Sequence, residues 1–367
     1  MNVRIYHFLL DHRIGGPHIY VDSIRSAMSR DVETLIVTTG RGPMTDLVLI
    51  NLRHMWTPLY ALEVPLNALL LLFWNFTGRV KFKNSIYVVH GAANLAPLIA
   101  ARFLRLSIVW HFHETTPIFC RFVSVGMRIL RNTRHKIAVV AKKSIEVYKL
   151  EEAEFLPAPI DTDFWCVKAV SEQEQESCEW MDMTGGVAPL RVLAVGNLNP
   201  LKGMDILIEA MKAIDGPWHL KIVGSSLKTQ QVYADALHES AEINNSKNQE
   251  MRIELLGWQD KRQVRALMST CDLFVLPSRS EACPLVLLEA MSIGCRVVAA
   301  DVGDVAAMMA TYPNKRIFQA ENVQDCSSAI DTIKYEATRN SKVDSTWQLR
   351  NVADKTEQFY RQFFHRG

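Results

Sequence analysis

The stretch SRSEACPLVLLEAM, residues 278–291, says most about how this chain folds. Just before it, the short apolar run of residues 273–276 favours a strand, and the proline and serines that follow end that run. Pro284 suits the first position of a helix, because its missing N–H would have no partner there, and helix-forming residues follow it. The order of strand, loop and buried helix is typical of a parallel sheet covered by helices.

Two carboxylates flank this predicted helix start. Glu281 precedes it, and Glu289 lies about 8 Å along the helix from Pro284, at a rise of ~1.5 Å per residue. The first helical amides, residues 285–287, should point outward, and with the helix dipole they suit a diphosphate at the carboxyl end of a strand. One carboxylate would then reach a sugar and the other a ribose. Taken alone, the pair is also explained by a loop glutamate and a solvated helix glutamate that bind no ligand. The ligand-binding and the structural interpretation therefore both stay open.

The spacing of the two glutamates matches a known family signature. Glu281 and Glu289 form the E-x7-E pattern of retaining GT-B glycosyltransferases, and residues 253–309 resemble glycosyltransferase family 4, the glycosyl transferases group 1. The segments RVLAVGNLNPLKGMDILIEAM (191–211) and AEFLPAPIDTDFW (153–165) are similar to the same family. The resemblance covers nearly the full chain and is strongest in its second half. It implies a GT-B fold, in which two Rossmann-like doubly wound domains face each other across a cleft.

Hydrophobic patterning independently predicts two α/β domains, because short Val, Ile and Leu runs alternate with longer segments of helical period. The first set of predicted strands covers residues 3–9, 33–38, 46–52, 85–90, 107–113 and 136–140. The pattern restarts with predicted strands at 191–195, 219–223, 253–256, 273–276 and 296–300, and with helices at 204–214, 231–243, 262–269 and 284–292.

These patterns give a predicted domain organisation. Residues 1–167 form an N-terminal Rossmann-like domain on the acceptor side, and residues 168–189, rich in Glu, form a polar linker. Residues 190–342 form a C-terminal Rossmann-like domain that the resemblance assigns to the nucleotide-sugar donor. Residues 343–367 have helical spacing, and the family implies that this last helix returns to the N-terminal domain.

The glycine loop of the predicted C-terminal domain, residues 196–203, follows the predicted strand at 191–195. Lys202 supplies a point charge for a diphosphate, and Gly203 permits the turn into the next helix. Without the family resemblance, Lys202 is equally an ordinary solvated loop lysine. The family usually has Arg or Lys directly after Gly196, whereas this chain has Asn197, so one phosphate-binding cation is missing or supplied elsewhere.

The remaining donor contacts come from the resemblance. Donor-binding residues are expected at Gly15, Gly16, Gly196, Asn197, Lys202, Cys283, Pro284, Leu285, Val286 and Glu289. After Gly303 the family generally has a second glycine and then a Glu three residues on, and here these positions hold Asp304 and Ala307. That contact is therefore absent.

In the first half, the family implies a catalytic histidine at His113, which would face the donor sugar. His111 lies two residues earlier on the same strand face, so the role could fall to it instead, and His90 is a further candidate. A histidine at a strand end is also a common structural hydrogen-bonder. No H-x-x-H, H-E-x-x-H or cysteine cluster occurs in the sequence, so we expect no metal and no other cofactor.

Length, charge and cysteine content limit the classes of protein to which this chain can belong. The chain has 367 residues, 49% of them hydrophobic, which is enough for two separate cores. Its net charge of +2 gives no support for nucleic-acid binding. Seven cysteines without C-x-x-C spacing favour reduced thiols in the cytoplasm. The N-terminal apolar run is short and followed by charge, which predicts a strand rather than a signal peptide.

Two segments bear on membranes. The uninterrupted apolar core of residues 59–76 covers only 68–74, well short of the ~20 residues of a span, so a buried or interfacial helix is expected there. Residues 121–136 combine arginines with apolar residues. Such a face suits an anionic membrane surface, and equally a solvated helix face. Peripheral attachment at the inner face of the membrane is the hypothesis.

The predicted activity is transfer of a sugar from a nucleoside diphosphate sugar to an acceptor hydroxyl with retention, in cell-surface polysaccharide, lipopolysaccharide or glycolipid synthesis. The acceptor would be a saccharide or a lipid-linked saccharide. Glu281 and His113 would hold the oxocarbenium-like sugar, with the acceptor attacking on the face that the diphosphate leaves. Double displacement through Glu281 is the mechanistic alternative. A GT-B nucleotide-sugar epimerase and a catalytically silent nucleotide-sugar binding module are the alternative functions.

Overall fold

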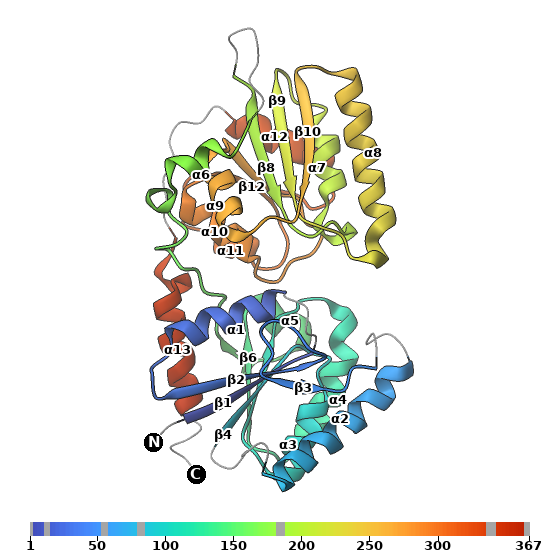
Figure 1. Ribbon diagram of the computed structural model, residues 1–367, viewed down its shortest axis with the longest axis vertical. Coiled ribbons are helices and arrows are strands. Elements are labelled where there is room, and N and C mark those ends of the chain that lie inside the picture. The colour runs from blue at the N-terminus through green and yellow to red at the C-terminus, as the bar shows by residue number, and fades with distance from the viewer. Residues whose placement is uncertain are drawn as a thin grey trace. The chain divides into compact units, whose positions relative to one another are not determined.

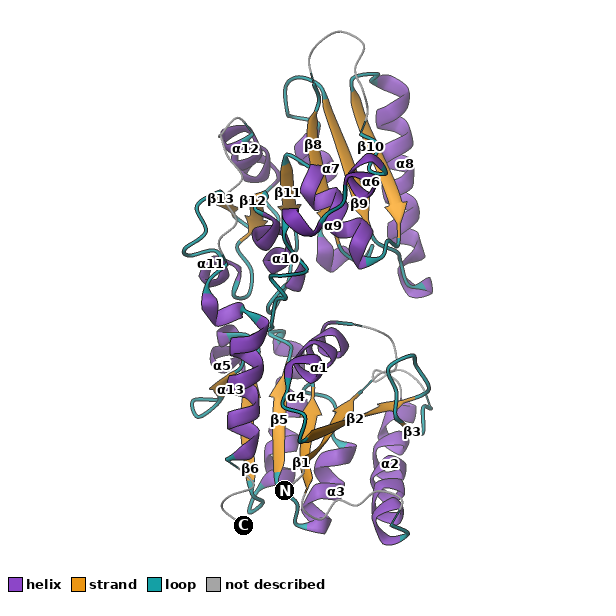
Figure 2. Cartoon of the chain, turned by 60° about the vertical axis from the view of Figure 1, so that its left-hand side comes forward, coloured by secondary structure: helices purple, strands orange, loops and turns teal. Residues whose placement is uncertain are grey.

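The protein, seen in a computed structural model, divides into two compact units (Figures 1 and 2). The structure describes residues 3–10, 15–52, 58–78, 85–180, 188–334 and 343–362. Unit 1 comprises Met1–Pro159 together with Thr346–Gly367, and unit 2 comprises Ile160–Ser345. Both units are described separately below.

Unit 1 is built on a seven-stranded sheet whose paired strands are all parallel, in the order β3-β2-β1-β4-β5-β6-β7. The strands are β1 (Val3–Leu9), β2 (Val32–Thr39), β3 (Leu47–Leu49), β4 (Ser85–His90), β5 (Ile108–Phe112), β6 (His135–Val139) and β7 (Glu154–Phe155). Successive side chains of a strand point to opposite faces. On β1, Tyr6 and Phe8 therefore enter one core and Val3 and Ile5 enter another.

Helices cover both faces of this sheet, as Figure 1 shows. They are α1 (Gly16–Ala27), α2 (Pro58–Phe76), α3 (Ala96–Leu104), α4 (Cys120–Leu130), α5 (Lys142–Tyr148) and α13 (Leu349–Arg361). Helices α2, α3 and α4 close the core that contains Tyr6, and α13 closes the opposite core through Phe359 and Tyr360. Helix α13 also packs on α1, and both oxygens of Asp31 accept from Arg361 at 2.8 Å.

Unit 2 is built on a six-stranded parallel sheet in the order β10-β9-β8-β11-β12-β13. The strands are β8 (Leu190–Val195), β9 (Trp218–Val223), β10 (Met251–Gly257), β11 (Leu273–Leu276), β12 (Arg296–Ala300) and β13 (Lys315–Phe318). The helices are α6 (Glu172–Glu176), α7 (Met204–Met211), α8 (Gln231–Lys247), α9 (Lys261–Thr270), α10 (Leu285–Ile293), α11 (Val305–Met308) and α12 (Val323–Ile333). Helices α7, α8 and α12 share one core with the strands. The direction of the strand order reverses between β8 and β11.

Short 3-10 turns connect several elements. They are η1 (Pro117–Phe119), η2 (Val167–Ala169), η3 (Pro200–Lys202), η4 (Lys228–Gln230) and η5 (Ser345–Trp347). The expected fold class, two Rossmann-like doubly wound parallel sheets, is therefore present in both units.

The expected polar linker differs from the structure. Residues from Ile160 onward already belong to unit 2, and within the expected linker at 168–189 the described part carries η2 and α6. A capping box between Ser171 and Glu174 starts α6, and the Glu174 carboxylate accepts from Arg265 of α9 at 3.0 and 3.1 Å. The acidic residues of this segment therefore form a surface helix packed on unit 2 rather than a spacer.

Candidate functional site

Three loops of unit 2 meet at the carboxyl ends of neighbouring strands. Residues 196–203 follow β8, residues 277–284 follow β11, and residues 301–304 follow β12. Because β11 pairs with both β8 and β12, these loops emerge side by side. The gap between β8 and β11 is the topological switch point of the sheet, where parallel α/β sheets bind ligands.

Glu281 and Lys202 are in direct contact at this point. The Lys202 Nζ lies 2.6 Å from Glu281 Oε1, and the Ser278 hydroxyl donates to the same oxygen at 2.7 Å. The Glu281 side chain retains only 9% of its exposure, whereas that of Lys202 retains 28%. The two residues predicted to hold the sugar and the diphosphate thus lie together, as a hydrogen-bonded ion pair.

A second ion pair ties the loop after β8 to the loop after β11. Arg279 donates to both carboxylate oxygens of Asp205, at 2.7 and 2.9 Å, and to the Pro200 carbonyl at 2.7 Å. The Tyr233 hydroxyl donates to Asp205 at 2.6 Å, and the Arg279 amide donates to the Leu201 carbonyl. The hydrogen bonds that Arg279 donates to Asp205 raise the pKa of Arg279. The sequence did not predict this ion pair, although Arg279 lies within residues 278–291.

Two glycines bring the loops into close backbone contact. Gly203 has a φ of +64°, and a Cβ there would lie 2.0 Å from the Pro277 carbonyl oxygen. Gly303 has a φ of +56°, and a Cβ there would lie 2.2 Å from the Glu281 carbonyl oxygen. The Asp304 amide donates to the Ala282 carbonyl at 3.1 Å. Glycine is therefore required at both positions to hold the backbone of Glu281 in place.

Helix α10 starts one residue later than expected. Pro284 is the N-cap residue rather than the first helical residue, and its carbonyl accepts the Leu287 amide at 3.1 Å. The expectation that the Leu287 amide points outward is therefore wrong, which leaves the amides of Leu285 and Val286 as the donors of the first turn. Cys283 is half-buried directly before this cap.

Glu289 lies one turn further along α10 and is partly exposed. Desolvation by the surrounding protein raises the pKa of Glu289 to about 8. At neutral pH its carboxyl group therefore carries a proton and can donate a hydrogen bond, a role that the sequence interpretation of two acceptor carboxylates did not include.

The glycine loop after β8 is held by backbone bonds. Gly196 donates to the Val223 carbonyl at 2.9 Å, and a Cβ on Gly196 would touch the side chains of Met204 and Lys202 at 3.4–3.5 Å. Asn197 is exposed and accepts from the Asn199 amide through its carbonyl at 2.9 Å. The Asn199 side-chain oxygen is buried and has no hydrogen-bond partner among the described residues. An amide oxygen in this state is available to a donor group of a ligand.

A separate cavity of about 390 Å³ lies in unit 2 away from these loops. Its lining includes Trp180, His219, Lys221, Arg252 and Glu254. Glu254 contacts the other three charged or titratable side chains at 2.6–3.8 Å. Each of these groups already has a partner in the cavity wall, so the loops around Glu281 remain the better candidate site.

In unit 1, the expected glycine loop lies at the start of α1. Gly15 is the N-cap residue, with an extended backbone, and α1 begins at Gly16. Among the described residues, no atom lies within 4 Å of a Cβ built on Gly15 or Gly16. This part of the structure therefore does not require glycine at these positions.

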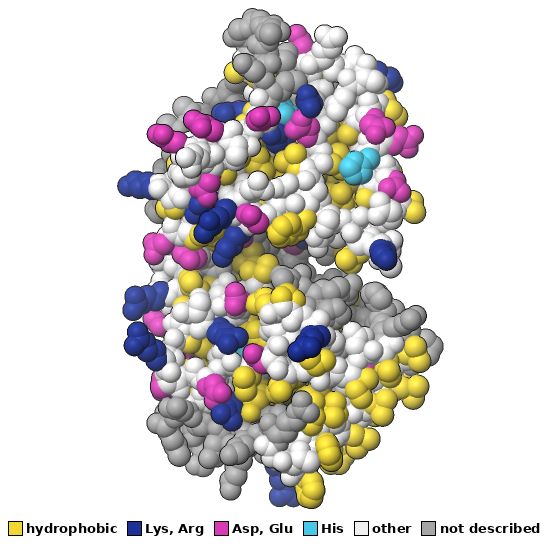
Figure 3. Space-filling view, in the orientation of Figure 1, with side chains coloured by type: hydrophobic (Ala, Val, Ile, Leu, Met, Phe, Trp, Pro, Cys, Tyr) yellow, Lys and Arg dark blue, Asp and Glu magenta, His cyan; other side chains and the backbone are white. Residues whose placement is uncertain are grey.

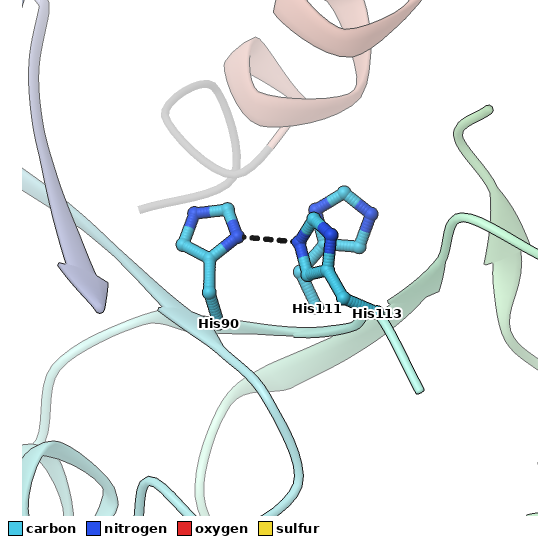
Figure 4. Close-up of side chains that lie close together, drawn as sticks. All are labelled: His90, His111 and His113. Carbon is cyan, nitrogen blue, oxygen red and sulfur yellow. Dashed lines mark hydrogen bonds between the residues drawn. The ribbon is translucent and has the colours of Figure 1, made fainter. Parts of the chain in front are cut away.

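Histidines gather at the carboxyl ends of β4 and β5, as Figure 4 shows for three of them. His90 Nδ1 lies 2.8 Å from His113 Nε2, and His90 Nε2 lies 3.0 Å from His7 Nδ1. Tyr20 packs edge-on against His111 and His113, with ring centroids 5.0 and 5.2 Å apart. His111 is fully buried, whereas His113 keeps partial exposure, so His113 is the one of the pair that a ligand can reach.

Burial keeps these imidazoles neutral. Desolvation lowers the pKa of His113 and of His7 to about 3, and it lowers the pKa of His90 and His111 well below the usual value. The Glu114 carboxylate accepts from the backbone amides of His113 and Ala92, and desolvation raises its pKa. Glu114 therefore fixes the turn that carries His113.

The same histidines have the composition of a metal site. Ring nitrogens of His90, His111 and His113 all lie within 4.8 Å of one another, and neutral imidazole is a common ligand of Zn²⁺. Two of these nitrogens are used in the hydrogen bond between His90 and His113. Sequence spacing placed His111 and His113 on one strand face, but it gave no sign that His90, which ends a different strand, lies beside them. The expected independence of metal stays a prediction.

The structure thus brings together Gly196, Lys202, Glu281, Pro284 and Leu285 in unit 2. Gly15, Gly16 and His113 lie in unit 1, where His113 belongs to the histidine cluster.

Comparison with known proteins places these observations in a family. Residues 187–344 match the family described as glycosyl transferases group 1. An uncharacterised glycosyltransferase of Methanocaldococcus jannaschii is 33% identical over 138 residues, which cover 38% of this chain and 36% of that protein. A D-inositol 3-phosphate glycosyltransferase of Rhodococcus erythropolis is 28% identical over 153 residues, covering 40% of this chain and 34% of that protein. The matches span about a third of the length of these curated relatives.

Solved structures match over nearly the whole chain. HepE of Anabaena, solved with UDP and glucose, has a TM-score of 0.74 at 19% identity and covers 99% of this chain and 97% of that one. Sucrose-phosphate synthase of Thermosynechococcus elongatus has a TM-score of 0.77 at 16% identity, with 99% and 100% covered. The chain therefore has the GT-B fold, and its residues 187–344 are similar to the glycosyl transferases group 1 family.

Proposed function

We propose that this protein is a retaining glycosyltransferase that moves a sugar from a nucleoside diphosphate sugar to an acceptor hydroxyl. The observation that carries the proposal is the contact between Lys202 and Glu281 at the switch point of a glycosyl transferases group 1 domain. A cation and a carboxylate at this place supply the two charges that departure of a diphosphate from a sugar requires.

The nature of the donor has support from related proteins. The HepE structures were solved with UDP, with UDP-glucose and with UDP and glucose, so UDP-sugars are the first donors to test. An amylovoran biosynthesis glycosyltransferase of Erwinia amylovora is 28% identical over 122 residues, covering 31% of this chain and 28% of that protein. In line with this likeness, we propose an acceptor that belongs to cell-surface polysaccharide or glycolipid synthesis.

Lys202 would exchange partners during the reaction. Without donor its ammonium is bonded to Glu281, and the negative charge that develops on the leaving diphosphate is a stronger partner. The amides of Leu285 and Val286, at the positive end of α10, would share that charge. As Lys202 turns to the diphosphate, Glu281 loses its cation and faces the developing positive charge of the sugar.

The bonds to Glu281 favour attack on the departing face over double displacement. Its Oε1 accepts from Ser278 as well as from Lys202, so one donor remains after Lys202 turns to the diphosphate, and a hydrogen-bonded oxygen is a poorer nucleophile. The acceptor hydroxyl would attack from the side on which the diphosphate leaves, and a diphosphate oxygen would take its proton. The configuration at the anomeric carbon is then retained.

The test combines donor consumption with product identity. Purified protein is incubated with a panel of UDP-, GDP- and ADP-sugars, and thermal shift identifies the donor, since a ligand that binds the folded state raises its melting temperature. Release of nucleoside diphosphate is then compared in wild type, Glu281→Gln and Lys202→Met. Each variant should lose about 10²–10³ of turnover, as for a lost transition-state charge contact.

Lys212→Met is the matched control. Lys212 makes an exposed ion pair with Glu209 at the same 2.6 Å, on α7 and away from the loops, so its loss should leave turnover unchanged. NMR of the first product formed reports the anomeric configuration. Inversion would overturn the retaining mechanism, and wild-type turnover in Glu281→Gln would overturn the site. A donor whose sugar changes configuration without release of the diphosphate would identify an epimerase instead.

A further inference from the structure

Helix α2 of unit 1 exposes apolar side chains and buries polar ones. All of its exposed, described side chains are apolar, namely Leu59, Ala61, Leu62, Pro65, Leu66, Leu69, Phe73 and Phe76. Its one charged residue, Glu63, is instead 4% exposed, and Asn67 is 1% exposed. Surface helices of water-soluble domains normally show the opposite distribution. The outer face of α2 is therefore built for an apolar environment.

The buried polar residues of α2 fix its orientation in unit 1. Glu63 accepts from the Leu52 amide at 2.7 Å, and Asn67 bonds both the amide and the carbonyl of Ile50 at 2.8–2.9 Å. Leu71 and Trp74 fill the core. By length and composition alone α2 could also cross a membrane. These bonds instead hold it flat along the surface of the unit, where it can lie in an interface but not span one.

Two neighbouring helices extend the face. Helix α3 packs between α2 and α4, and it exposes Phe103 by 70%. The exposed apolar residues on α4 are Val125 and Met127. Figure 3 shows hydrophobic side chains gathered on the part of unit 1 where Figure 1 places α2, α3 and α4. We define the outer surface of these three helices as the α2–α4 face.

The charge of the α2–α4 face has one sign. Its exposed charged residues are Arg102, Arg121 and Arg128, with Arg105 and Arg131 at the ends of α3 and α4. Helices α3 and α4 contain no acidic residue, and the one acidic residue of α2 is the buried Glu63. A contiguous apolar surface edged by arginines matches lipid acyl chains edged by anionic head groups.

We propose that the α2–α4 face docks unit 1 on an anionic lipid bilayer, with α2 lying in the interface and its leucines and phenylalanines among the upper acyl chains. A second copy of the chain is a poorer occupant, because a symmetric pairing of this face would bring arginines against arginines. The inference rests on unit 1 alone, so it is independent of the donor chemistry proposed for unit 2.

The test is co-sedimentation of the full-length protein with vesicles. Phosphatidylcholine vesicles containing phosphatidylglycerol are compared with vesicles of phosphatidylcholine alone. Leu69→Ser/Phe73→Ser removes two apolar contacts from α2 and should lower the partition coefficient at least about ten-fold. Val232→Ser/Trp258→Ser is the matched control, because these side chains are 85% and 73% exposed in unit 2 and the double change should leave binding unaltered.

Charge-reversal variants distinguish binding to lipid from binding to another protein. Arg121→Glu/Arg128→Glu should weaken binding to the phosphatidylglycerol vesicles, and 0.5 M salt should weaken binding of the wild type. Thermal melts of all variants check that unit 1 stays folded. Equal binding by wild type and the Leu69/Phe73 variant would overturn the proposal. So would a stable dimer in analytical ultracentrifugation that the same two substitutions dissociate while vesicle binding is absent.

Discussion

The loops around Glu281 in unit 2 and the histidine cluster in unit 1 occupy equivalent places in their sheets, yet they are opposite in chemistry. The first is charged, with Lys202 and Arg279 each bonded to a carboxylate. The second is neutral, because desolvation keeps His7, His90 and His113 uncharged. One fold thus carries an anion site in one unit and a cluster of uncharged hydrogen-bonding groups in the other.

This difference indicates a division of labour for the proposed reaction. A charged site stabilises the diphosphate, whose charge grows as the bond breaks, whereas neutral imidazoles can orient hydroxyl groups without attracting a diphosphate. Substitutions in the charged site and in the histidine cluster should therefore lower activity by different amounts.

The largest expected effect compares Lys202→Met with His113→Asn. Loss of the lysine should lower kcat/KM for the donor by about 10²–10³, because a charge contact in the transition state is lost. Loss of the histidine should cost roughly two- to ten-fold, the range of a neutral hydrogen bond. Steady-state kinetics with the identified donor measures both. Equal losses would show that the two sites are not specialised in this way.

The next effect compares Gly303→Ala with Gly16→Ala. At Gly303 the new methyl group would collide with the Glu281 carbonyl, at a backbone conformation that costs about 1–2 kcal/mol for a residue with a side chain. At Gly16 it would meet no atom of the described residues within 4 Å. Urea unfolding should therefore show a destabilised Gly303→Ala protein and an unchanged or slightly more stable Gly16→Ala protein. If Gly16→Ala keeps its stability but loses donor turnover, the glycine serves a ligand.

Acid should destabilise unit 1 through its histidines. The unfolded chain binds protons at an ordinary pKa near 6.5, whereas His7 and His113 stay neutral until about pH 3. Stability is therefore lost as the pH falls from 6.5 towards 3, at roughly 1.4 kcal/mol per pH unit for each such histidine. Melts at pH 7, 6 and 5 measure the slope. His7→Gln should flatten it, while His238→Gln, on the exposed face of α8, should not.

The smallest expected effect is a loss of stability with rising pH, which has the opposite sign to that of the histidines and lies in unit 2. Glu289 stays protonated in the folded protein up to about pH 8, whereas the unfolded chain ionises it near pH 4.5. Stability is therefore lost as the pH rises from 4.5 to 8. Glu289→Gln removes this penalty and should raise the melting temperature at pH 8.5 by roughly 2–4 °C, for a gain of ~1 kcal/mol. No change between the two proteins at pH 8.5 would refute the raised pKa.

The sequence predicted the buried strands closely, since short apolar runs bounded by turn residues rarely form other structures. Strands β1, β4, β11 and β12 have the predicted bounds. The edge strand β3 is shorter than predicted, Leu47–Leu49 instead of 46–52, because Glu63 and Asn67 of α2 bond Leu52 and Ile50 in place of a neighbouring strand. Such a substitution of partners leaves no local signal.

The candidate site was predicted residue by residue but not contact by contact. Lys202 and Glu281 stand 79 positions apart, and only the folded sheet shows that they bond each other. The Arg279–Asp205 ion pair was missed for the same reason. His113, His111 and His90 were predicted as alternatives for one role, but their contacts with one another and with His7 were not predicted. These residues come from three strands, β1, β4 and β5, and strand ends meet only through the sheet order.

Helix α13 has a consequence for how the protein is made. It supplies Phe359 and Tyr360 to a core of unit 1, yet it is encoded after all of unit 2. During translation the ribosome therefore releases unit 2 while Val3, Ile5 and their neighbours still lack the helix that covers them. Unit 2 can complete its folding on the growing chain, whereas unit 1 must wait as an intermediate with one open sheet face, the state in which chaperones would encounter this protein.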